Sequence, residues 1–492
     1  MTTPTKVLAV VAVALLVPAV GCNDPLKVQT PDIVPPGALA TSLATLRAAA
    51  IGDFSIAYTG DHPDGSGGTA EGVIEYGGML ADEFVNSETF PTRIEVDARS
   101  IHLTNSDVDL WYRLMHRARN SAETSAARYN SLSPADPGYP EVLDLAGYTY
   151  LFFAETFCSG VPVSRLNADG SITYGSPLTT VQLLDTAMAR FDSAISIATR
   201  LDTAAAIASI QQEMIQFATV GKARALLFRA NRPGGLATDF ATAATVAATV
   251  PTSFAYIEEH TTTSDRENNG VFNAGATDGR YSISDSSAGT AGQKGINGFP
   301  FLSIPDPRTP AQLDPGGVGF DGTTPLWDNL RYGGRAAPIP IATGVEARLI
   351  QAEAALQAGD TAMGGQFFAQ LNDPRVNAAA RPYFNPNPFD RTNPLTAAIP
   401  ALAPLDTSNI RLAGGAVNLL FAERARWLWL TAHRLGDLRR LIAQYNRPQN
   451  QVFPTGAYFK GSPAVYGTDV NIPVPVTEQN NPNFNACLDR NP

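Results

Sequence analysis

Alanine-rich segments with helical periodicity come in pairs along this chain, and they constrain its fold more than any other feature. Residues 218–231 read ATVGKARALLFRAN, and residues 239–250 read DFATAATVAATV after a Pro-Gly-Gly break. Two amphipathic helices joined by so short a break bury their apolar stripes against each other, and small alanine side chains allow a close approach. The sequence therefore predicts an all-α body built from helical hairpins.

The same periodicity marks helices over most of the remaining chain. The hairpins are tetratricopeptide-like, although their period is too irregular for a clean repeat. Ser106 and Asp107 can cap one helix and Thr179 another, since their side-chain oxygens accept hydrogen bonds from free backbone N–H groups. Apolar stripes predict helices over about 39–58, 73–85, 106–122, 139–157, 180–197, 217–230, 239–249, 345–358 and 418–444, the last as one long helix or a broken pair.

The helical periodicity fades between residues 251 and 340, where Gly, Asn, Asp, Ser and Pro dominate. A long irregular region in a structured protein is often functional. Its aromatic residues, such as Tyr281, Trp327 and Tyr332, either stack on a sugar or peptide ligand or plug the long loop onto the body. We predict one integrated body with a helical region at 39–250, a loop-rich ligand-face insertion with little β-structure at 251–340, and a C-terminal region at 341–492.

The first residues, MTTPTKVLAVVAVALLVPAVGC, predict export from the cytoplasm. A lysine precedes an apolar run, and small residues follow it, which is the pattern of a cleavable signal. The cysteine makes residues 1–21 resemble a lipoprotein signal peptide, with Cys22 as the lipidated first residue of a Pro-rich tether at 22–38. An ordinary signal peptide cleaved near Gly21, or an uncleaved anchor, is the alternative.

Beyond Cys22 the chain has two cysteines, Cys158 and Cys487. Export places them in an oxidising space, where an even number of cysteines favours a disulfide. Such a bridge would tie the C-terminal tail to the middle of the body. Two buried free thiols are the alternative.

Charge and motifs argue against several classes of function. The formal net charge is −11 and no run of Lys or Arg interrupts it, so nucleic acid is disfavoured as a partner. The chain has no G-x-S-x-G, no H-E-x-x-H, no P-loop and no dinucleotide-binding motif, and its 5 histidines are scattered. We therefore predict a binding protein rather than an enzyme, with no catalytic residues, no metal site and no cofactor.

Five segments, in order, resemble motifs of the SusD/RagB-like family of outer-membrane nutrient-binding lipoproteins. Thr431, Ala432 and His433 depart from the family pattern just before Arg434, so the chain resembles a divergent branch. The resemblance runs over almost the whole chain and implies an all-α, SusD-like fold. The segments are DVDLWYRLMHRARNSAE (107–123), LAGYTYLFFAETFCSGVPVS (145–164), EARLIQAEAAL (346–356), ERARWLWLTAHRLGDLRRL (423–441) and NIPVPVTEQNNPN (471–483).

The fourth of these segments carries closely spaced charges. Arg434, Asp437, Arg439 and Arg440 lie on one predicted helix, and Glu423 precedes them by about three turns. Carboxylates and guanidinium groups that meet between helices form ion pairs supported by hydrogen bonds. We predict that these five residues form a structural network that is at least partly buried.

The resemblance also implies a function. Family members are held by a lipid at the outer membrane, exposed on the cell surface, where each acts as a hinged lid over a SusC-like TonB-dependent transporter and captures a glycan or sometimes a peptide. By resemblance to starch-binding members, Asp82 and Arg93 in the loop 80–99 would contact the ligand, although they could equally form an internal pair. The aromatic residues of this loop are Phe84 and Phe90, without Trp or Tyr, which weakens starch as the ligand.

Two other functions are compatible with these residues. A helical-repeat scaffold would organise envelope proteins without a small ligand, and a flat surface over 251–340 would favour it. An exported glycan-active enzyme would turn over a glycan. A transporter gene beside this one would favour nutrient capture.

Overall fold

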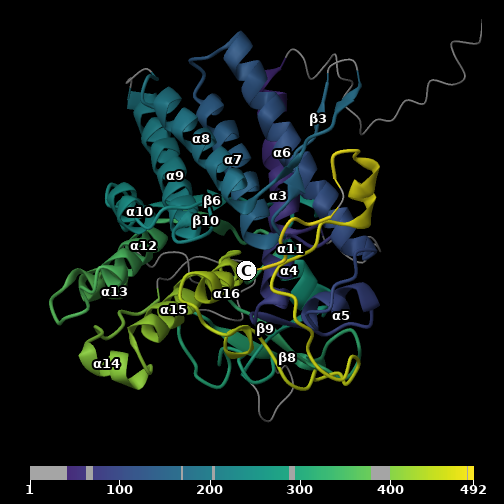
Figure 1. Ribbon diagram of the computed structural model, residues 1–492, viewed down its shortest axis with the longest axis vertical. Coiled ribbons are helices and arrows are strands. Elements are labelled where there is room, and N and C mark those ends of the chain that lie inside the picture. The colour runs from purple at the N-terminus through teal and green to yellow at the C-terminus, as the bar shows by residue number, and fades with distance from the viewer. Residues whose placement is uncertain are drawn as a thin grey trace, which may run out of the picture. The chain divides into compact units, whose positions relative to one another are not determined.

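The computed structural model describes residues 42–61, 70–167, 170–201, 205–286, 294–377, 399–484 and 486–491 (Figure 1). The chain divides into the units Met1–Thr45 and Leu46–Pro492, and the architecture below is that of the second. The predicted signal peptide, Cys22 and the tether at 22–38 lie outside the described residues. Their roles therefore stay predictions.

Helices make up about half of the described chain and the strands are few and short, which confirms the predicted fold class. None of the described helices is both long enough and apolar enough to cross a bilayer. The α-helices are α3 (Leu43–Thr59), α4 (Val73–Leu80), α5 (Pro91–Asp97), α6 (Ser106–Leu132), α7 (Gly138–Thr156), α8 (Thr180–Ala198), α9 (Ala205–Arg229), α10 (Asp239–Ala247), α11 (Gly270–Phe272), α12 (Gly344–Gln357), α13 (Gln366–Val376), α14 (Thr407–Leu412), α15 (Ala416–Trp427) and α16 (Arg434–Ala443).

Consecutive helices pack on one another, as the alanine-rich hairpin pattern predicts. Helices α6 to α9 lie side by side, α10 packs on both α9 and α12, and α12 packs on α13 (Figure 1). Phe191 of α8 shows why small residues are needed at these contacts. A Cβ atom added to Gly147 of α7 would lie 2.5 Å from the Phe191 ring, and one added to Gly221 of α9 would lie 2.4 Å from it. Glycine at both positions lets one aromatic ring fill the space between three helices.

The predicted N-terminal cap is confirmed for α8 but not for α6. Thr179 caps α8, since its hydroxyl accepts a hydrogen bond from the Gln182 N–H and the Thr179 N–H donates one to Gln182 Oε1. The predicted caps Ser106 and Asp107 instead lie inside α6. Asn105 is the cap, because its backbone is extended and its side-chain oxygen accepts from the N–H groups of Asp107 and Val108.

The predicted helix over 418–444 is a broken pair. Helix α15 ends at Trp427 and α16 begins at Arg434, and Leu430 and Ala432 between them have φ values of 54° and 60°. Residues other than glycine rarely adopt this left-handed conformation, so tertiary contacts must hold it. The Leu430 N–H donates to Glu83 Oε1 at 2.8 Å, and the Tyr332 hydroxyl donates to the Leu430 carbonyl at 2.9 Å.

The insertion contains more β-structure than its composition predicts, although every sheet in the described chain has two antiparallel strands. The helix predicted over 73–85 is also too long, because α4 ends at Leu80 and residues 84 and 85 belong to strand β1. The pairs are β1 (Phe84–Asn86) with β7 (Tyr281–Ile283), β2 (Val161–Pro162) with β5 (Pro177–Leu178), β3 (Arg165–Leu166) with β4 (Ile172–Thr173), β6 (Ala255–Glu258) with β10 (Ile339–Thr343), and β8 (Ala311–Val318) with β9 (Pro325–Asn329).

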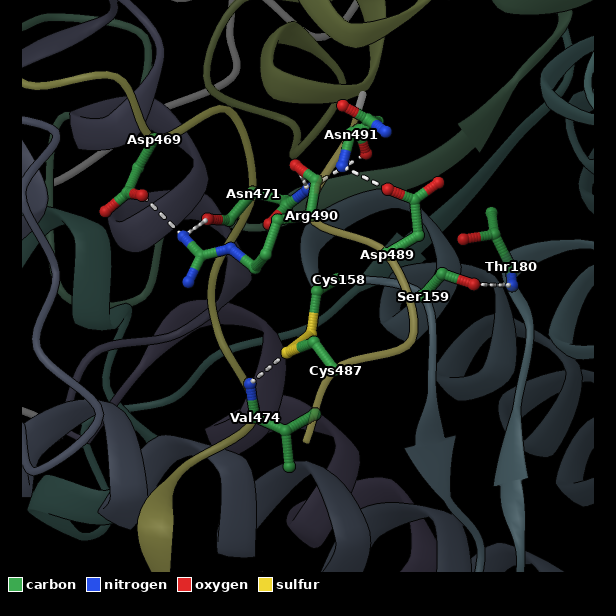
Figure 2. The surroundings of a disulfide bond; sticks show 10 residues. All are labelled: Cys158, Ser159, Thr180, Asp469, Asn471, Val474, Cys487, Asp489, Arg490 and Asn491. Atoms are coloured by element: carbon green, nitrogen blue, oxygen red, sulfur yellow. Dashed lines mark hydrogen bonds and ion pairs between the residues drawn. A yellow bond between two sulfur atoms is a disulfide. The ribbon is translucent and has the colours of Figure 1, made fainter. Parts of the chain in front are cut away.

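A disulfide joins Cys158 and Cys487, which confirms the predicted bridge (Figure 2). Cys158 follows α7 and is fully buried, and its Cα lies 6.0 Å from the Cα of Cys487 in the C-terminal tail. Backbone hydrogen bonds hold the same tail beside it, because the Ser159 N–H donates to the Asp489 carbonyl and the Leu488 N–H donates to the Ser159 carbonyl. The end of the chain is thereby fixed to the middle of the body.

Replacing both cysteines, as Cys158→Ser with Cys487→Ser, should lower the free energy of unfolding by about 2–5 kcal/mol, because the bridge restricts a very long loop in the unfolded chain. Chemical denaturation of the two proteins at equilibrium measures the difference. Reductant added to the wild type should give the same loss, and a double variant as stable as the oxidised wild type would contradict the prediction.

Candidate functional site

Asp82, a predicted ligand contact, is fully buried and paired inside the protein. Arg434 Nε donates to Asp82 Oδ1 at 2.6 Å and Arg434 Nη2 donates to Oδ2 at 2.7 Å, while the Phe299 N–H donates to Oδ2 at 3.0 Å. A carboxylate held by three donors away from water has little left to offer a ligand. This geometry favours an internal role for Asp82.

Arg93 is also internal, although its partners are carboxylates other than Asp82. Its Nε lies 2.5 Å from Glu71 Oε1 and 3.2 Å from Glu88 Oε1, and all three side chains are almost fully buried. Asp82 and Arg93 are therefore both internal, but they do not form the pair with each other that the sequence left open, because each belongs to a separate ion cluster.

The three aromatic candidates differ in exposure. Tyr281 is buried and its hydroxyl donates to Glu71 Oε1 at 2.6 Å, and buried Tyr332 donates to a backbone carbonyl of the break between α15 and α16. Both rings fix the insertion to the body, which is the plug alternative. Trp327 on β9 is partly buried, and its ligand role stays a prediction.

Of the five residues predicted to form one network, Asp437 and Arg440 meet in a buried ion cluster with Arg424, whereas Arg434 pairs with Asp82 instead. Asp437 accepts hydrogen bonds from Arg424 Nε and from Arg440 Nη2 at 2.8 Å. Burial would raise the pKa of Asp437, but these two guanidinium groups outweigh it and hold the pKa well below its usual value. Arg439 donates to the carbonyl of Ala154 at 2.9 Å, which ties α16 to α7.

Glu423 belongs to a neighbouring cluster rather than to the α16 arginines. Arg308 Nη1 lies 2.6 Å from Glu423 Oε2, and Arg375 Nη1 lies 2.8 Å from the same oxygen. The sequence could not show this, because Arg308 and Arg375 come from the insertion and from α13. These two ion pairs join α15 to the insertion and to α13.

A pocket of about 1000 Å³ is lined by three separate segments, and its lining includes Glu88 of the Arg93 cluster. Residues from 88–95 at the start of α5 form one wall, residues from 321–325 between β8 and β9 form the second, and residues from 459–463 of the C-terminal segment form the third. Figure 1 shows α5, β8 and β9 at the same end of the molecule. The lining combines carboxylates, hydroxyl groups and apolar side chains, a mixture typical of small-ligand sites.

Two ion pairs hold carboxylates that line this pocket. Lys460 Nζ lies 2.7 Å from Asp321 Oδ2, and Arg280 Nη1 lies 2.8 Å from Glu88 Oε2. Burial would raise the pKa of Asp321, but hydrogen bonds from Lys460, Thr324 and Thr323 lower the pKa to about 2. For Glu88, burial outweighs the two nearby arginines and raises the pKa to about 7.

Two exposed aromatic residues are neighbours, in the chain, of residues that line the pocket. Phe90 is 44% exposed and lies between lining residues Thr89 and Pro91, and Phe320 is 55% exposed and precedes Asp321. Their ring centroids are 6.3 Å apart with the rings stacked, and the Arg280 guanidinium carbon lies 5.6 Å from both centroids. We call these two rings the phenylalanine pair.

The loop 80–99, in which the sequence placed Asp82 and Arg93 as ligand contacts, borders this pocket, but neither residue is in its lining. Residues 80–99 do contribute a wall, through residues that follow Asp82 and flank Arg93. The sequence did not indicate that Lys460, Phe459 and Asp321 line a pocket. Nothing in it pairs a C-terminal loop with a turn about 140 residues earlier. Within the described residues, no group of three or more His, Cys, Asp or Glu side chains is placed to hold a metal ion.

No family model and no curated protein matches this chain in sequence. Solved structures match it closely in fold. A SusD/RagB family protein from Bacteroides thetaiotaomicron is 12% identical, with a TM-score of 0.61 over 89% of this chain and 94% of that chain. A SusD-like carbohydrate-binding protein from Bacteroides fragilis is 12% identical, with a TM-score of 0.57 over 91% of this chain and 100% of that chain.

A third match is surface glycan-binding protein A from Bacteroides uniformis, which is 12% identical, with a TM-score of 0.52 over 91% of this chain and 99% of that chain. This chain has the SusD/RagB-like fold. The predicted SusD-like architecture is thus confirmed, and the low identity agrees with a divergent sequence.

In this SusD-like fold, Asp82→Asn should lower the free energy of unfolding by about 3–5 kcal/mol, because the charge of Arg434 would be left buried without its partner. Equilibrium denaturation measures the loss. Asp185→Asn is the matched control, since it breaks an Asp–Arg pair in which the Asp185 side chain is 50% exposed, and should cost about 1 kcal/mol or less. Equal losses in the two variants would contradict the buried-pair interpretation.

Glu83 predicts a dependence of stability on pH. Burial raises its pKa to about 8, against an ordinary carboxyl pKa near 4.5. The folded chain therefore keeps a proton that the unfolded chain releases, so this group's contribution to stability is lost as the pH rises from about 4.5 to about 8. The wild-type protein should therefore lose about 2 kcal/mol or more of its free energy of unfolding through this group between mildly acidic and mildly alkaline solution. The variant Glu83→Gln should not show this loss. Parallel pH profiles of unfolding for the two proteins would overturn the prediction.

Proposed function

We propose that this chain is a divergent SusD/RagB-like lipoprotein that captures a glycan at the cell surface and passes it to a TonB-dependent outer-membrane transporter. The observation that carries the proposal is the fold, which is shared with a carbohydrate-binding protein and a surface glycan-binding protein over 91% of this chain. A peptide is the alternative ligand.

The ligand site of this proposal is the pocket between α5, the β8–β9 turn and residues 459–463. Sugars bind where apolar ring faces meet aromatic side chains and hydroxyl groups meet polar ones. The phenylalanine pair and Phe459 supply the rings. Thr89, Thr323 and Ser462 supply hydroxyl groups in the lining.

Binding without turnover is the proposed activity. A glycosidase requires two carboxyl groups that flank the bond it cleaves, and the lining of this pocket contains three, those of Glu88, Glu95 and Asp321. However, Glu88 is fully buried and held by Arg280, while Asp321 is held by Lys460 and by the Thr324 hydroxyl. A carboxyl group bound in this way is poorly placed to transfer a proton to a glycosidic oxygen or to activate water.

Membrane attachment in this proposal comes from a lipid on Cys22. The chain continues from that cysteine through a Pro-rich segment at 22–38, which would serve as a tether. A lid on such a tether can stay at the mouth of a transporter without a spanning helix of its own.

Affinity purification of the lipidated protein from its own outer membrane, followed by mass spectrometry, tests the proposal. A large TonB-dependent barrel should be recovered in a stoichiometric amount. The Cys22→Ser variant should leave the membrane fraction, because the acylated side chain is missing, and should recover far less of the barrel. Recovery of the wild-type protein alone, or with periplasmic proteins only, would favour a helical-repeat scaffold instead.

A further inference from the structure

Carboxylates outnumber cations in the lining of the pocket. Glu88, Glu95 and Asp321 line it, and Lys460 is the one cation among the described lining residues. Arg93 and Arg280 lie behind Glu88, where Arg93 is shared with Glu71 and Arg280 with Asp278. The surface offered to a ligand is therefore negative, as is the chain as a whole, whose formal net charge is −11.

Lys460 has no N–H left for a ligand. Its ammonium group donates to Asp321 Oδ2 at 2.7 Å, to the Glu88 carbonyl at 2.6 Å and to Asn86 Oδ1 at 3.2 Å. An ammonium has three donors, and all three are used within the protein. A carboxylate or sulfate on a ligand would thus meet negative side chains and no available cation.

Glu95 is the lining carboxylate whose charge is least compensated. Its oxygens accept from the Asn105 amide at 2.8 Å and from the backbone N–H of His102 at 3.2 Å, and one lies 2.9 Å from the exposed His102 ring. No lysine or arginine of the described residues pairs with it. Asp82 also has three close polar contacts, but it is fully buried, whereas the side chain of Glu95 is 22% exposed. An ionised carboxylate accepts about four hydrogen bonds, so Glu95, as a lining residue, keeps acceptor capacity for a ligand.

We propose that this pocket selects an oligosaccharide that carries protonated amino groups, and that Glu95 is the carboxylate that recognises the amine. The inference rests on the proposed function, since it takes the pocket as the glycan site. A cationic amine beside Glu95 forms a charge-assisted hydrogen bond, which is about twice as strong as a neutral one. The apolar and hydroxyl-bearing walls and the phenylalanine pair favour a sugar over a peptide.

Calorimetric titration of the purified full chain in detergent tests the inference, with the tetramer of glucosamine and the tetramer of N-acetylglucosamine as probes. The two probes share ring and linkage but differ in charge at mildly acidic pH. We expect the glucosamine tetramer to bind about tenfold more tightly or better, with an affinity that falls as salt is added. Equal affinities, or tighter binding of the acetylated tetramer or of an acidic oligogalacturonate, would overturn the inference.

The variant Glu95→Gln isolates the proposed contact, because glutamine keeps the size and the acceptor oxygen but loses the charge. This variant should bind the glucosamine tetramer about tenfold more weakly than the wild type, and any affinity for the acetylated tetramer should be unchanged. Glu259→Gln is the matched control, since Glu259 is exposed and is not part of the lining. An unchanged affinity of Glu95→Gln for the glucosamine tetramer would remove Glu95 from the recognition site.

Two further results separate this inference from the proposed function. If neutral glycans bind and amine-bearing glycans do not, the inference fails while glycan capture stands. If no glycan binds and tetralysine does, the ligand is a basic peptide and the sugar assignment fails.

Discussion

Between α16 and the loop after α4, the Arg434 guanidinium holds the Asp82 carboxylate with two hydrogen bonds, away from water. Two charges buried in this way are stable only as a pair, so the helix and the loop keep one relative position. The next residue, Glu83, accepts from the N–H of Leu430 and supports the left-handed break between α15 and α16. The wall of the pocket at 88–95 continues directly from this anchored loop.

The insertion depends on the same region of the body. Strand β7 pairs with β1 immediately after Glu83, and the Tyr332 hydroxyl donates to Leu430. A segment rich in Gly, Ser and Asn buries little apolar surface of its own, so these pairings and buried tyrosine hydrogen bonds must order it. Once it is ordered, the turn between β8 and β9 brings Asp321 beside Lys460, and the second and third walls of the pocket meet.

The chemical character of the pocket follows from how its charges are satisfied. Lys460 forms an ion pair with Asp321 and Arg280 forms one with Glu88. The positive charges near the lining are thus neutralised within the protein, where they stabilise the fold and do not attract anions. Glu95 lacks a partner of this kind among the described residues. A pocket of this composition suits a neutral or cationic ligand better than an anionic one.

Periodicity, caps and composition determined by themselves the helical class, the order of the hairpins and the Thr179 cap, because each depends on neighbouring residues. They also favoured the bridge between Cys158 and Cys487, since these are the two cysteines beyond Cys22. The tertiary structure alone decided that Asp82 and Arg93 are internal and that Glu423 meets Arg308 and Arg375. It also decided that the pocket joins residues 88–95, 321–325 and 459–463. The physical reason is that an ion pair or a pocket wall needs closeness in space, and a residue's local sequence carries no record of which distant charge will neutralise it.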